Sequence, residues 1–260
     1  MDFLRRFGGI ARLYGPEALG RFPRAHVCII GIGGVGSWTV EALARSAIGK
    51  LTLIDMDHLA ESNINRQLPA LEETLGRSKI GVMAERARAI NPGVELFLVD
   101  DFLTRENLVE LVRKEFDYVV DCIDSFRTKA ALIHHCRRNR IRLVTVGGAG
   151  GQIDPQRIRV TDLSRTQQDP LLARTRRLLR QEYGFPRNPR RRFQVSAVWS
   201  DEPLMQHALP GESCEGRPTG GLNCGGYGSC TPVTAGFGMA AAAHVLRKLA
   251  RTTSSNGVNC

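Results

Sequence analysis

A glycine-rich loop, GIGGVG, lies between an apolar run, HVCII, and an apolar-patterned segment, VGSWTVEALARSAIG. Its spacing, Gly31-x-Gly33-x-x-Gly36 with Gly34 inside it, fits the dinucleotide-binding fingerprint, and Asp55 ends the next apolar run about 20 residues later. Glycines let a phosphate approach the backbone, a helix N-terminus offers free amides to an anion, and a carboxylate accepts hydrogen bonds from a ribose. The loop therefore predicts a nucleotide site. Taken with Asp55 alone it suggests a nicotinamide or flavin cofactor, although the same physics serves ATP.

Polar residues after the apolar runs distinguish these cofactors. SNINRQL supplies Asn63 and Arg66, GRSKI places Lys79 at the start of an expected helix, and DCIDS supplies Asp124 and Ser125. A hydride-transfer cofactor needs only a pyrophosphate cradle, whereas a triphosphate under attack also needs cations and a carboxylate for Mg²⁺. We interpret Arg66 and Lys79 as catalytic cations at the phosphates and Asp124 as the catalytic carboxylate that holds Mg²⁺ through ATP, with Ser125 beside it in the nucleotide site. Each residue alone could be a surface cation or a helix N-cap, but the ordered combination favours ATP.

Strand-like and helix-like patterns alternate along the first part of the chain. The strand-like runs are AHVCIIGIGG, KLTLIDMD, VELFLVDDFL, DYVVDCID and IRLVTVGGAGG, and the helical patterns between them include SKIGVMAERARAI, RENLVELVRKEF and FRTKAALIHHCRRNR. Five such alternations with short connections predict an α/β fold with a Rossmann-like, doubly wound and mostly parallel sheet. Open sheets of this kind bind ligands at the carboxyl ends of their strands, and the polar residues above fall at that edge.

The regular alternation of strand-like and helix-like patterns ends near residue 153. We expect one domain, with a nucleotide-binding core over 1–152, a basic substrate-binding extension of strands, loops and a final helix over 153–250, and a disordered tail over 251–260. The apolar stretch of the final helix, 233–246, is shorter than the roughly 20 residues that a membrane span needs. The sequence therefore predicts a packed helix and no stable membrane span, with peripheral membrane association as an alternative.

The chain is strongly basic, with a formal net charge of +10 and a pI near 9.7. This charge favours polyanionic partners, although a basic surface with no nucleic acid role is an equal reading of charge alone. The charge concentrates in RTRRLLR and RNPRRRF, which we expect to contact RNA phosphates and to make binding sensitive to salt. The arginines are Arg174, Arg176, Arg177, Arg180, Arg187, Arg190, Arg191 and Arg192.

Seven cysteines are scattered without a secreted disulfide framework, so we expect mostly reduced thiols and a cytoplasmic protein. Cys214, Cys224 and Cys230 have irregular spacing, and no CxxC pair exists in the chain, which predicts no structural zinc. Cys224 and Cys230 are candidate nucleophiles, because a thiolate can accept an acyl group or sulfur. The alternative role for each is that of a small buried residue near the site.

The segments GIGGVGSWTVEALARSAIGKLTLIDMD, SNINRQL, LGRSK, INP and DCIDS together resemble the E1-like activating enzymes. This superfamily includes the ubiquitin-activating, molybdopterin-synthase-activating and thiamine-thiocarboxylate enzymes, and the resemblance covers roughly residues 5–150. It implies that ATP·Mg²⁺ is used to adenylate a carboxylate. The roles it implies are a phosphate loop at Gly34, a ribose ligand at Asp55, phosphate ligands at Asn63, Arg66 and Lys79, and metal binding at Asp124.

The opening segment RRFGGIARLYGPEALGRFPRAHV and the later segment LNCGGYGSCTPVTAGFGMAAAAHVLRKL are similar to the bacterial tRNA threonylcarbamoyladenosine dehydratase branch of that superfamily. The resemblance implies a tRNA substrate whose modified adenosine lies next to the anticodon. Its threonine carboxylate would be adenylated, and the ureido group would then close a ring and release AMP. The resemblance also implies a homodimer, in which Arg6 or Arg12 reaches the ATP of the neighbouring subunit. A monovalent cation in the glycine-rich segment GESCEGRPTGGLNCGGYGSC and a sulfur-transfer partner are left open.

Two alternatives belong to other functional classes. An activator of a ubiquitin-like or sulfur-carrier C-terminus would share the ATP chemistry, but the missing zinc cysteines and the arginine cluster oppose it. An NAD-dependent oxidoreductase is opposed by the SNINRQ and GRSK elements. We therefore expect an ATP-dependent, adenylating enzyme that acts on tRNA.

Overall fold

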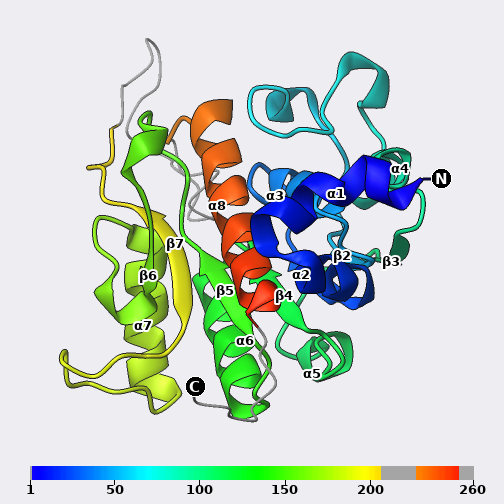
Figure 1. The fold of residues 1–260 in the computed structure, drawn as a ribbon. Coiled ribbons are helices and arrows are strands. Elements are labelled where there is room, and N and C mark those ends of the chain that lie inside the picture. The colour runs from blue at the N-terminus through cyan, green and yellow to red at the C-terminus, as the bar shows by residue number, and fades with distance from the viewer. Residues whose placement is uncertain (1, 206–226, 252–260) are drawn as a thin grey trace, which may run out of the picture.

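A computed structural model of the protein describes residues 2–205 and 227–251. Its centre is one seven-stranded sheet with the order β3-β2-β1-β4-β5-β7-β6 (Figure 1). All neighbouring strands pair in parallel except β6 and β7, which are antiparallel. The strands are β1 (His26–Ile30), β2 (Lys50–Ile54), β3 (Glu95–Val99), β4 (Tyr118–Asp121), β5 (Leu143–Val146), β6 (Ile158–Asp162) and β7 (Ser196–Ser200).

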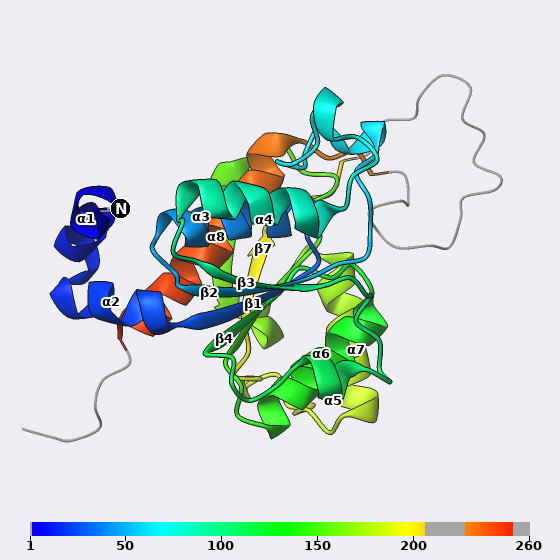
Figure 2. The same cartoon turned by 90° about the vertical axis from the view of Figure 1, so that its right-hand side faces the viewer.

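Helices cover both faces of the sheet (Figure 2). One face packs against α3 (Gly36–Arg45), α4 (Lys79–Ile90) and α8 (Thr231–Ala250), and the other against α5 (Leu108–Leu111), α6 (Phe126–Arg138) and α7 (Pro170–Glu182). The helices α1 (Phe3–Tyr14) and α2 (Pro16–Arg21) pack on each other to one side of the sheet. Short 3₁₀ turns occupy Phe22–Arg24, Glu61–Asn63, Glu72–Thr74, Pro155–Arg157 and Leu163–Arg165.

The predicted fold class is confirmed, because the sheet is doubly wound, mostly parallel and followed by a final helix. The helix expected over RENLVELVRKEF is shorter than predicted and covers only α5. The chain beyond residue 153 adds strands β7 and β6 to the same sheet, with β7 beside β5 and β6 at the edge. The expected disordered tail lies outside the described residues from 252 onward.

The parallel strands give the sheet two chemically different edges. We call the edge where β1, β2, β4, β5 and β7 end the carboxyl edge, and the edge where they begin the amino edge. Among the described residues, no helix combines the length and apolar character that crossing a bilayer requires.

Candidate active site

A cleft of about 440 Å³ opens at the carboxyl edge. Its walls are the loops that follow β1, β2 and β4, together with the start of α4. Parallel strands bring their carboxyl ends together, which explains why residues distant in the sequence meet here. The predicted residues that line the cleft are Gly31, Gly33, Gly34, Asp55, Asn63, Arg66, Lys79, Asp124 and Ser125.

The glycines of the loop serve close approaches of the backbone. Gly31 has a φ of 87°, and a Cβ there would lie 2.9 Å from the Cys122 carbonyl oxygen. Gly36 does not line the cleft; a Cβ on it would lie 1.8 Å from the Gly31 carbonyl oxygen, so it permits the tight packing of α3 on the loop. No side chain caps the N-terminus of α3, and the Ser37 and Thr39 amides each donate to a backbone carbonyl at 3.1 Å, which leaves the other amides of the first turn for an anion.

Asp55 is held in place by the backbone around it. Its carboxylate accepts hydrogen bonds from the Ile32 amide at 2.5 Å and the Asp57 amide at 2.8 Å, and only 7% of the residue is exposed. Burial raises the pKa of the Asp55 carboxyl, while the two amides and the nearby charge of Lys79 act in the opposite direction. The carboxylate is thus fixed at the end of β2, where a ribose hydroxyl can donate to its remaining lone pairs.

Lys79 is the first residue of α4, which Ser78 caps, and it is buried rather than exposed. Its Nζ lies 2.7 Å from Asp57 Oδ2, so the cation enters the cleft already paired with a carboxylate. Asp57 also lines the cleft and is half exposed. It is a site residue that the sequence analysis did not identify, although its position two residues after Asp55 in the loop following β2 was a possible signal.

Asn63 and Arg66 lie on the loop between β2 and α4. Asn63 is buried, and its Oδ1 accepts a hydrogen bond from the Ala60 amide at 3.1 Å, so it braces its own turn. The Arg66 guanidinium is held by the Ser62 carbonyl at 2.6 Å and by Asn65 Oδ1 at 2.9 Å. Its positive charge therefore has neutral partners only and remains available to a phosphate.

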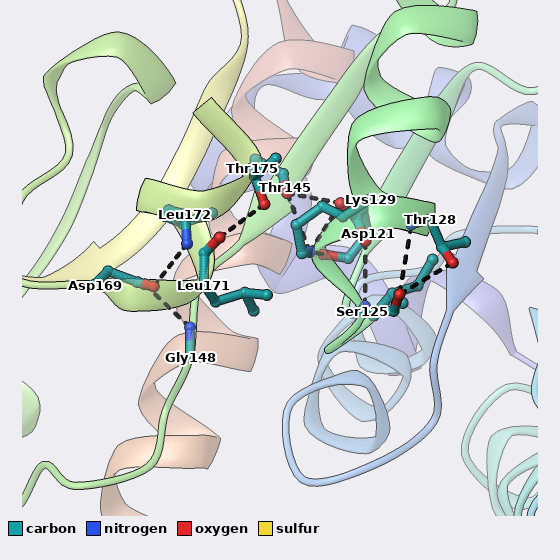
Figure 3. A network of polar contacts seen from close by, with 11 residues as sticks. Asp121, Ser125, Thr128, Lys129, Thr145, Gly148, Asp169, Leu171, Leu172 and Thr175 are labelled. Atoms are coloured by element: carbon teal, nitrogen blue, oxygen red, sulfur yellow. Dashed lines mark hydrogen bonds and ion pairs between the residues drawn. The ribbon is translucent and has the colours of Figure 1, made fainter. Parts of the chain in front are cut away.

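Asp124 and Ser125 follow β4 and divide two tasks. Ser125 caps α6, because its Oγ accepts from the Thr128 amide at 3.5 Å and from the Thr128 hydroxyl at 3.2 Å (Figure 3). The alternative in which Asp124 itself caps this helix is thus wrong. Its carboxylate is exposed, lines the cleft and has no hydrogen bond or ion pair to any other described residue.

A buried ion pair lies beneath this loop and was not expected from the sequence. Lys129 Nζ lies 2.9 Å from Asp121 Oδ2, and both side chains are 0% exposed. Thr145 donates to the same carboxylate oxygen at 2.6 Å (Figure 3). The Ile123 amide donates to Asp121 Oδ1 at 3.1 Å. The pair thereby links β4, α6 and β5 and fixes the start of the loop that presents Asp124.

Asp169 performs a similar task at the end of β5. Its carboxylate accepts from the Gly148 amide at 3.0 Å and from the Leu172 amide at 2.9 Å, which ties the loop after β5 to the start of α7 (Figure 3). Burial raises the pKa of Asp169 to about 6.

A smaller cavity of about 60 Å³ adjoins the main cleft. Its lining includes Gly147 and Gly148 of the loop after β5 and Thr234 of α8. It shares Gly33, Gly34, Arg66 and Asp124 with the main cleft. The two cavities therefore adjoin each other at the glycine loop, Arg66 and Asp124.

The predicted RNA-binding arginines divide into two groups. Arg176 donates to the Thr166 hydroxyl, and burial lowers the pKa of its guanidinium. Arg180 donates to the Pro186 carbonyl at 3.4 Å and lies over the Phe193 ring at 5.1 Å. These two side chains serve the packing of α7. The exposed members are Arg174, Arg177, Arg187, Arg190, Arg191 and Arg192.

The arginine segment, residues 187–192, lies at the amino edge, because it directly precedes β7 (Figure 1). The N-terminus of α7 lies near the carboxyl edge, where Asp169 contacts Gly148. The exposed arginines therefore extend from one edge of the sheet to the other along α7 and the loop after it.

The candidate nucleophiles are placed only in part. Cys214 and Cys224 lie outside the described residues, so the zinc expectation stays a prediction. Cys230 is half-buried at the N-terminus of α8, with its Sγ 3.8 Å from the Gln152 carbonyl oxygen. Cys122 lines the cleft, but burial raises the pKa of its thiol to about 12, which keeps it protonated and unreactive.

The two N-terminal arginines differ in their contacts. Arg6 donates to the Ile90 carbonyl of its own chain at 2.5 Å. The Arg12 side chain is exposed and has no hydrogen bond or ion pair to another described residue, so of the two it is freer to contact another molecule.

Known proteins match both the sequence and the fold. The model of the ThiF family matches residues 8–259. The tRNA threonylcarbamoyladenosine dehydratase of Haemophilus influenzae is 50% identical over 254 residues, which are 97% of this chain and 96% of that protein. Crystal structures of the Escherichia coli tRNA N6-threonylcarbamoyladenosine dehydratase with ATP and with AMP are 49% identical, with a TM-score of 0.85, and cover 95% of this chain and 94% of theirs.

A more distant relative shares less of the chain. The Escherichia coli sulfur carrier protein ThiS adenylyltransferase is 34% identical over 131 residues, which are 50% of this chain and 52% of that protein. The match to the dehydratases instead spans the core and the basic extension alike. The chain therefore belongs to the ThiF family and, within it, to the branch of the tRNA threonylcarbamoyladenosine dehydratases.

Proposed function

We propose that this protein uses ATP to dehydrate N6-threonylcarbamoyladenosine in tRNA, at the position next to the anticodon. The threonine carboxylate attacks the α-phosphate of ATP, forms an acyl adenylate and releases pyrophosphate. The ureido group of the same nucleoside then attacks the activated carbonyl, closes a ring and releases AMP. The observation that carries this proposal is the cleft at the carboxyl edge, because it gathers the nucleotide-binding residues beside a second cavity.

The chemistry needs a leaving group more than it needs an enzyme nucleophile. A carboxylate is a poor acyl donor until one oxygen can depart, and AMP provides that departure. The closing nucleophile already belongs to the substrate, so its effective concentration replaces a catalytic nucleophile of the protein. A catalytic thiolate is therefore not needed in the cleft, where the Cys122 thiol stays protonated. Arg66 and Lys79 are the cations that line it.

We assign the work of the cleft as follows. The loop from Gly31 to Gly34 and the N-terminus of α3 hold the phosphates, and Asp55 accepts from the ribose. Arg66 and Lys79 stabilise the charge that develops on the departing pyrophosphate. Asp57 holds the ammonium group of Lys79 in place, since the two are 2.7 Å apart.

Magnesium fits the donor set of this cleft. Asp124 presents an exposed carboxylate that is free of other partners, and Mg²⁺ is commonly bound by one or two carboxylates together with phosphates and waters. Among the described residues, no group of three or more His, Cys, Asp or Glu side chains could form a separate metal cage. When bound, Mg²⁺ supplies charge neutralisation and orientation of the phosphates.

The remaining assignments concern partners. We propose that tRNA phosphates bind the exposed arginines of α7 and of the arginine segment, and that the protein works as a homodimer in the cytoplasm. In that dimer Arg12 is the better candidate to reach the ATP of the neighbouring subunit, since Arg6 is engaged within its own chain. We also propose a monovalent cation in the glycine-rich segment 211–230, most of which lies outside the described residues, a sulfur-transfer partner and a role for Cys230.

Pyrophosphate release tests the function directly. The assay compares threonylcarbamoylated tRNA, unmodified tRNA and a carrier protein that ends in Gly-Gly, each with ATP and Mg²⁺. We expect release only with the modified tRNA, together with loss of one water from its nucleoside by mass spectrometry. Release with the carrier protein alone would replace this proposal by a protein-activating function.

A further inference from the structure

A second charged cavity, of about 450 Å³, lies at the amino edge beneath the first residues of β4, β5 and β7. We call it the basic cavity. Four cations from three parts of the fold line it: Arg137 of α6, Arg140 and Arg142 of the loop before β5, and Lys248 of α8. No Asp or Glu is among the described residues that line it.

These charges are largely without counterions. The side chains of Arg140 and Lys248 are exposed and make no hydrogen bond or ion pair with another described residue. Arg137 donates to the neutral Gln194 Oε1 at 2.9 Å. Arg142 is the exception, because its guanidinium lies 3.7 Å from Asp117 Oδ1. The cavity therefore keeps a positive charge that an anion can neutralise.

The backbone at Arg140 is held in a conformation that favours glycine. Arg140 has a φ of 59° and lies just beyond the end of α6, where the Ile141 amide closes the helix on the Cys136 carbonyl at 2.8 Å. Helices commonly place glycine at this position, because a side chain is disfavoured there. Gln194, which lines the same cavity, also has a positive φ of 57°. Strained residues of this kind gather at functional sites more often than elsewhere.

The cations influence a neighbouring group. His244 of α8 lies 3.1 Å from the Tyr118 hydroxyl, and Tyr118 lines the basic cavity. Burial first, and then the charges of Lys248 and Arg247, lower the pKa of His244 to about 4. The imidazole is thus neutral at physiological pH, and the positive field at this end of α8 comes from the lysine and the arginine.

The positive surface continues toward α7. An adjoining cavity of about 260 Å³ shares Arg137 with the basic cavity and adds Arg138 beside Tyr183. The arginine segment lies at the same edge, before β7. A single small anion would need one cluster of cations, whereas a row of cations along an edge suits a polyanion.

We propose that the basic cavity binds backbone phosphates of the tRNA at a distance from the reacting nucleoside. The proposal rests on the tRNA-dependent function above. Strands of four or five residues place the two edges roughly 17 Å apart, a span of about five base pairs of a nucleic acid stem. The nucleoside enters the cleft at the carboxyl edge, and the stem follows α7 to the amino edge.

Arg140→Gly, Lys248→Gln and their double variant test the proposal, with Arg88→Gln as the matched control. Arg88 is an exposed arginine of α4, on the face of the sheet opposite to α6 and α7, and its side chain has no described partner. Binding of unmodified tRNA is measured by fluorescence anisotropy across a range of salt concentrations. We expect each substitution in the cavity to weaken binding about 3- to 10-fold and to reduce the salt slope by about 0.7–0.9 per charge, while Arg88→Gln changes neither.

Arg140→Gly also separates a structural role from a binding role. Glycine suits the backbone at this position, so the melting temperature should rise by about 2–4 °C while RNA affinity falls. Unchanged tRNA affinity and salt slope in the double variant would overturn the proposal, as would an equal loss in Arg88→Gln. Calorimetry with inorganic phosphate and sedimentation with anionic phospholipid vesicles separate the sources. If either ligand bound and required Arg140 while tRNA affinity stayed the same, RNA would not be the occupant.

The two proposals fail in distinguishable ways. Pyrophosphate release by the unsubstituted protein with modified tRNA reports on the function alone. Normal release together with unaltered tRNA binding by the double variant would remove the cavity proposal and leave the function standing. If the unsubstituted protein released no pyrophosphate but the double variant bound tRNA more weakly, the proposed function would fail and the cavity proposal would stand.

Discussion

The two edges of the sheet carry their charges in opposite ways. At the carboxyl edge, Lys79 is buried and paired with Asp57, and the fully buried pair of Asp121 and Lys129 lies beneath the cleft. At the amino edge, Arg140 and the arginine segment are exposed. Buried charges need partners, so their positions are fixed by the fold, whereas exposed charges act through their sum and can be removed one at a time. The first arrangement suits chemistry at one atom, and the second suits a long, charged ligand.

The largest expected effect is at Gly34. A Cβ there would lie 3.2 Å from Thr234 Cγ2 and 3.3 Å from Arg66 Cγ, and a carboxylate would in addition oppose the phosphates. We expect Gly34→Glu to abolish ATP binding in calorimetry. Gly34→Ala, which adds the steric contact without the charge, should retain weakened binding. Retained ATP affinity in Gly34→Glu would place the phosphates elsewhere.

Removal of one partner of the buried ion pair of Asp121 and Lys129 should lower the stability of the folded protein strongly. Lys129→Met leaves Asp121 charged without its counterion, which we expect to lower the free energy of unfolding by about 3–5 kcal/mol. Lys114→Met, at an exposed lysine, should change it by less than about 0.5 kcal/mol. Urea denaturation of both variants measures the difference. Equal stability of the two would mean that the buried pair does not support the loop after β4.

Asp124→Asn should separate catalysis from folding. The carboxylate has no described partner, so stability should remain within about 0.5 kcal/mol of the unsubstituted protein. Pyrophosphate release should fall about 10²- to 10³-fold, and its dependence on Mg²⁺ should weaken. Asp100→Asn, an exposed carboxylate after β3, is the control and should release pyrophosphate normally. Full activity of Asp124→Asn would end its assignment to the metal.

Asp169 predicts a pH dependence of stability with a definite sign. Its pKa is raised to about 6 in the folded state, against an ordinary value of 3.8. Between these values the folded state binds more protons than the unfolded state, so this residue lowers stability as the pH rises from about 4 to about 6, by on the order of 2 kcal/mol. The difference between the unfolding curves of the unsubstituted protein and Asp169→Asn isolates this contribution. A difference that stays constant across this range would contradict it.

Much of the carboxyl edge could be predicted because its residues follow apolar runs directly. Asp55 and Asp124 come just after β2 and β4, and an alternating pattern places those strand ends together. The pairs of Lys79 with Asp57 and of Lys129 with Asp121 could not be predicted, because each joins a helix to a strand or a loop through side-chain packing. Their only sequence signal is a charged residue within or beside a buried run.

The second half of the chain was less predictable for a related reason. The sequence indicates a basic helix and short strands beyond residue 153, but the order β5-β7-β6 depends on which strand pairs with the edge of the core. The arginines of α7 look alike in the sequence, yet Arg176 and Arg180 turn inward because the helix places them toward Thr166 and Phe193. Helical position relative to the sheet, rather than residue type, decides which arginines can meet RNA.

The smallest expected effect distinguishes the exposed arginines from those that turn inward. Substitution of Arg190, Arg191 and Arg192 together by Gln should weaken tRNA binding about 10-fold at moderate salt and reduce the salt slope by about 2–3, while ATP affinity and stability stay unchanged. Arg176→Gln carries the same change of charge per residue but removes a half-buried contact with Thr166, so it should lower stability more than RNA affinity. The two outcomes differ because exposed charges serve the ligand and inward charges serve the fold. If the triple variant kept its tRNA affinity and Arg176→Gln lost it, RNA would follow the inner side of α7, and the amino edge would have no part in substrate binding.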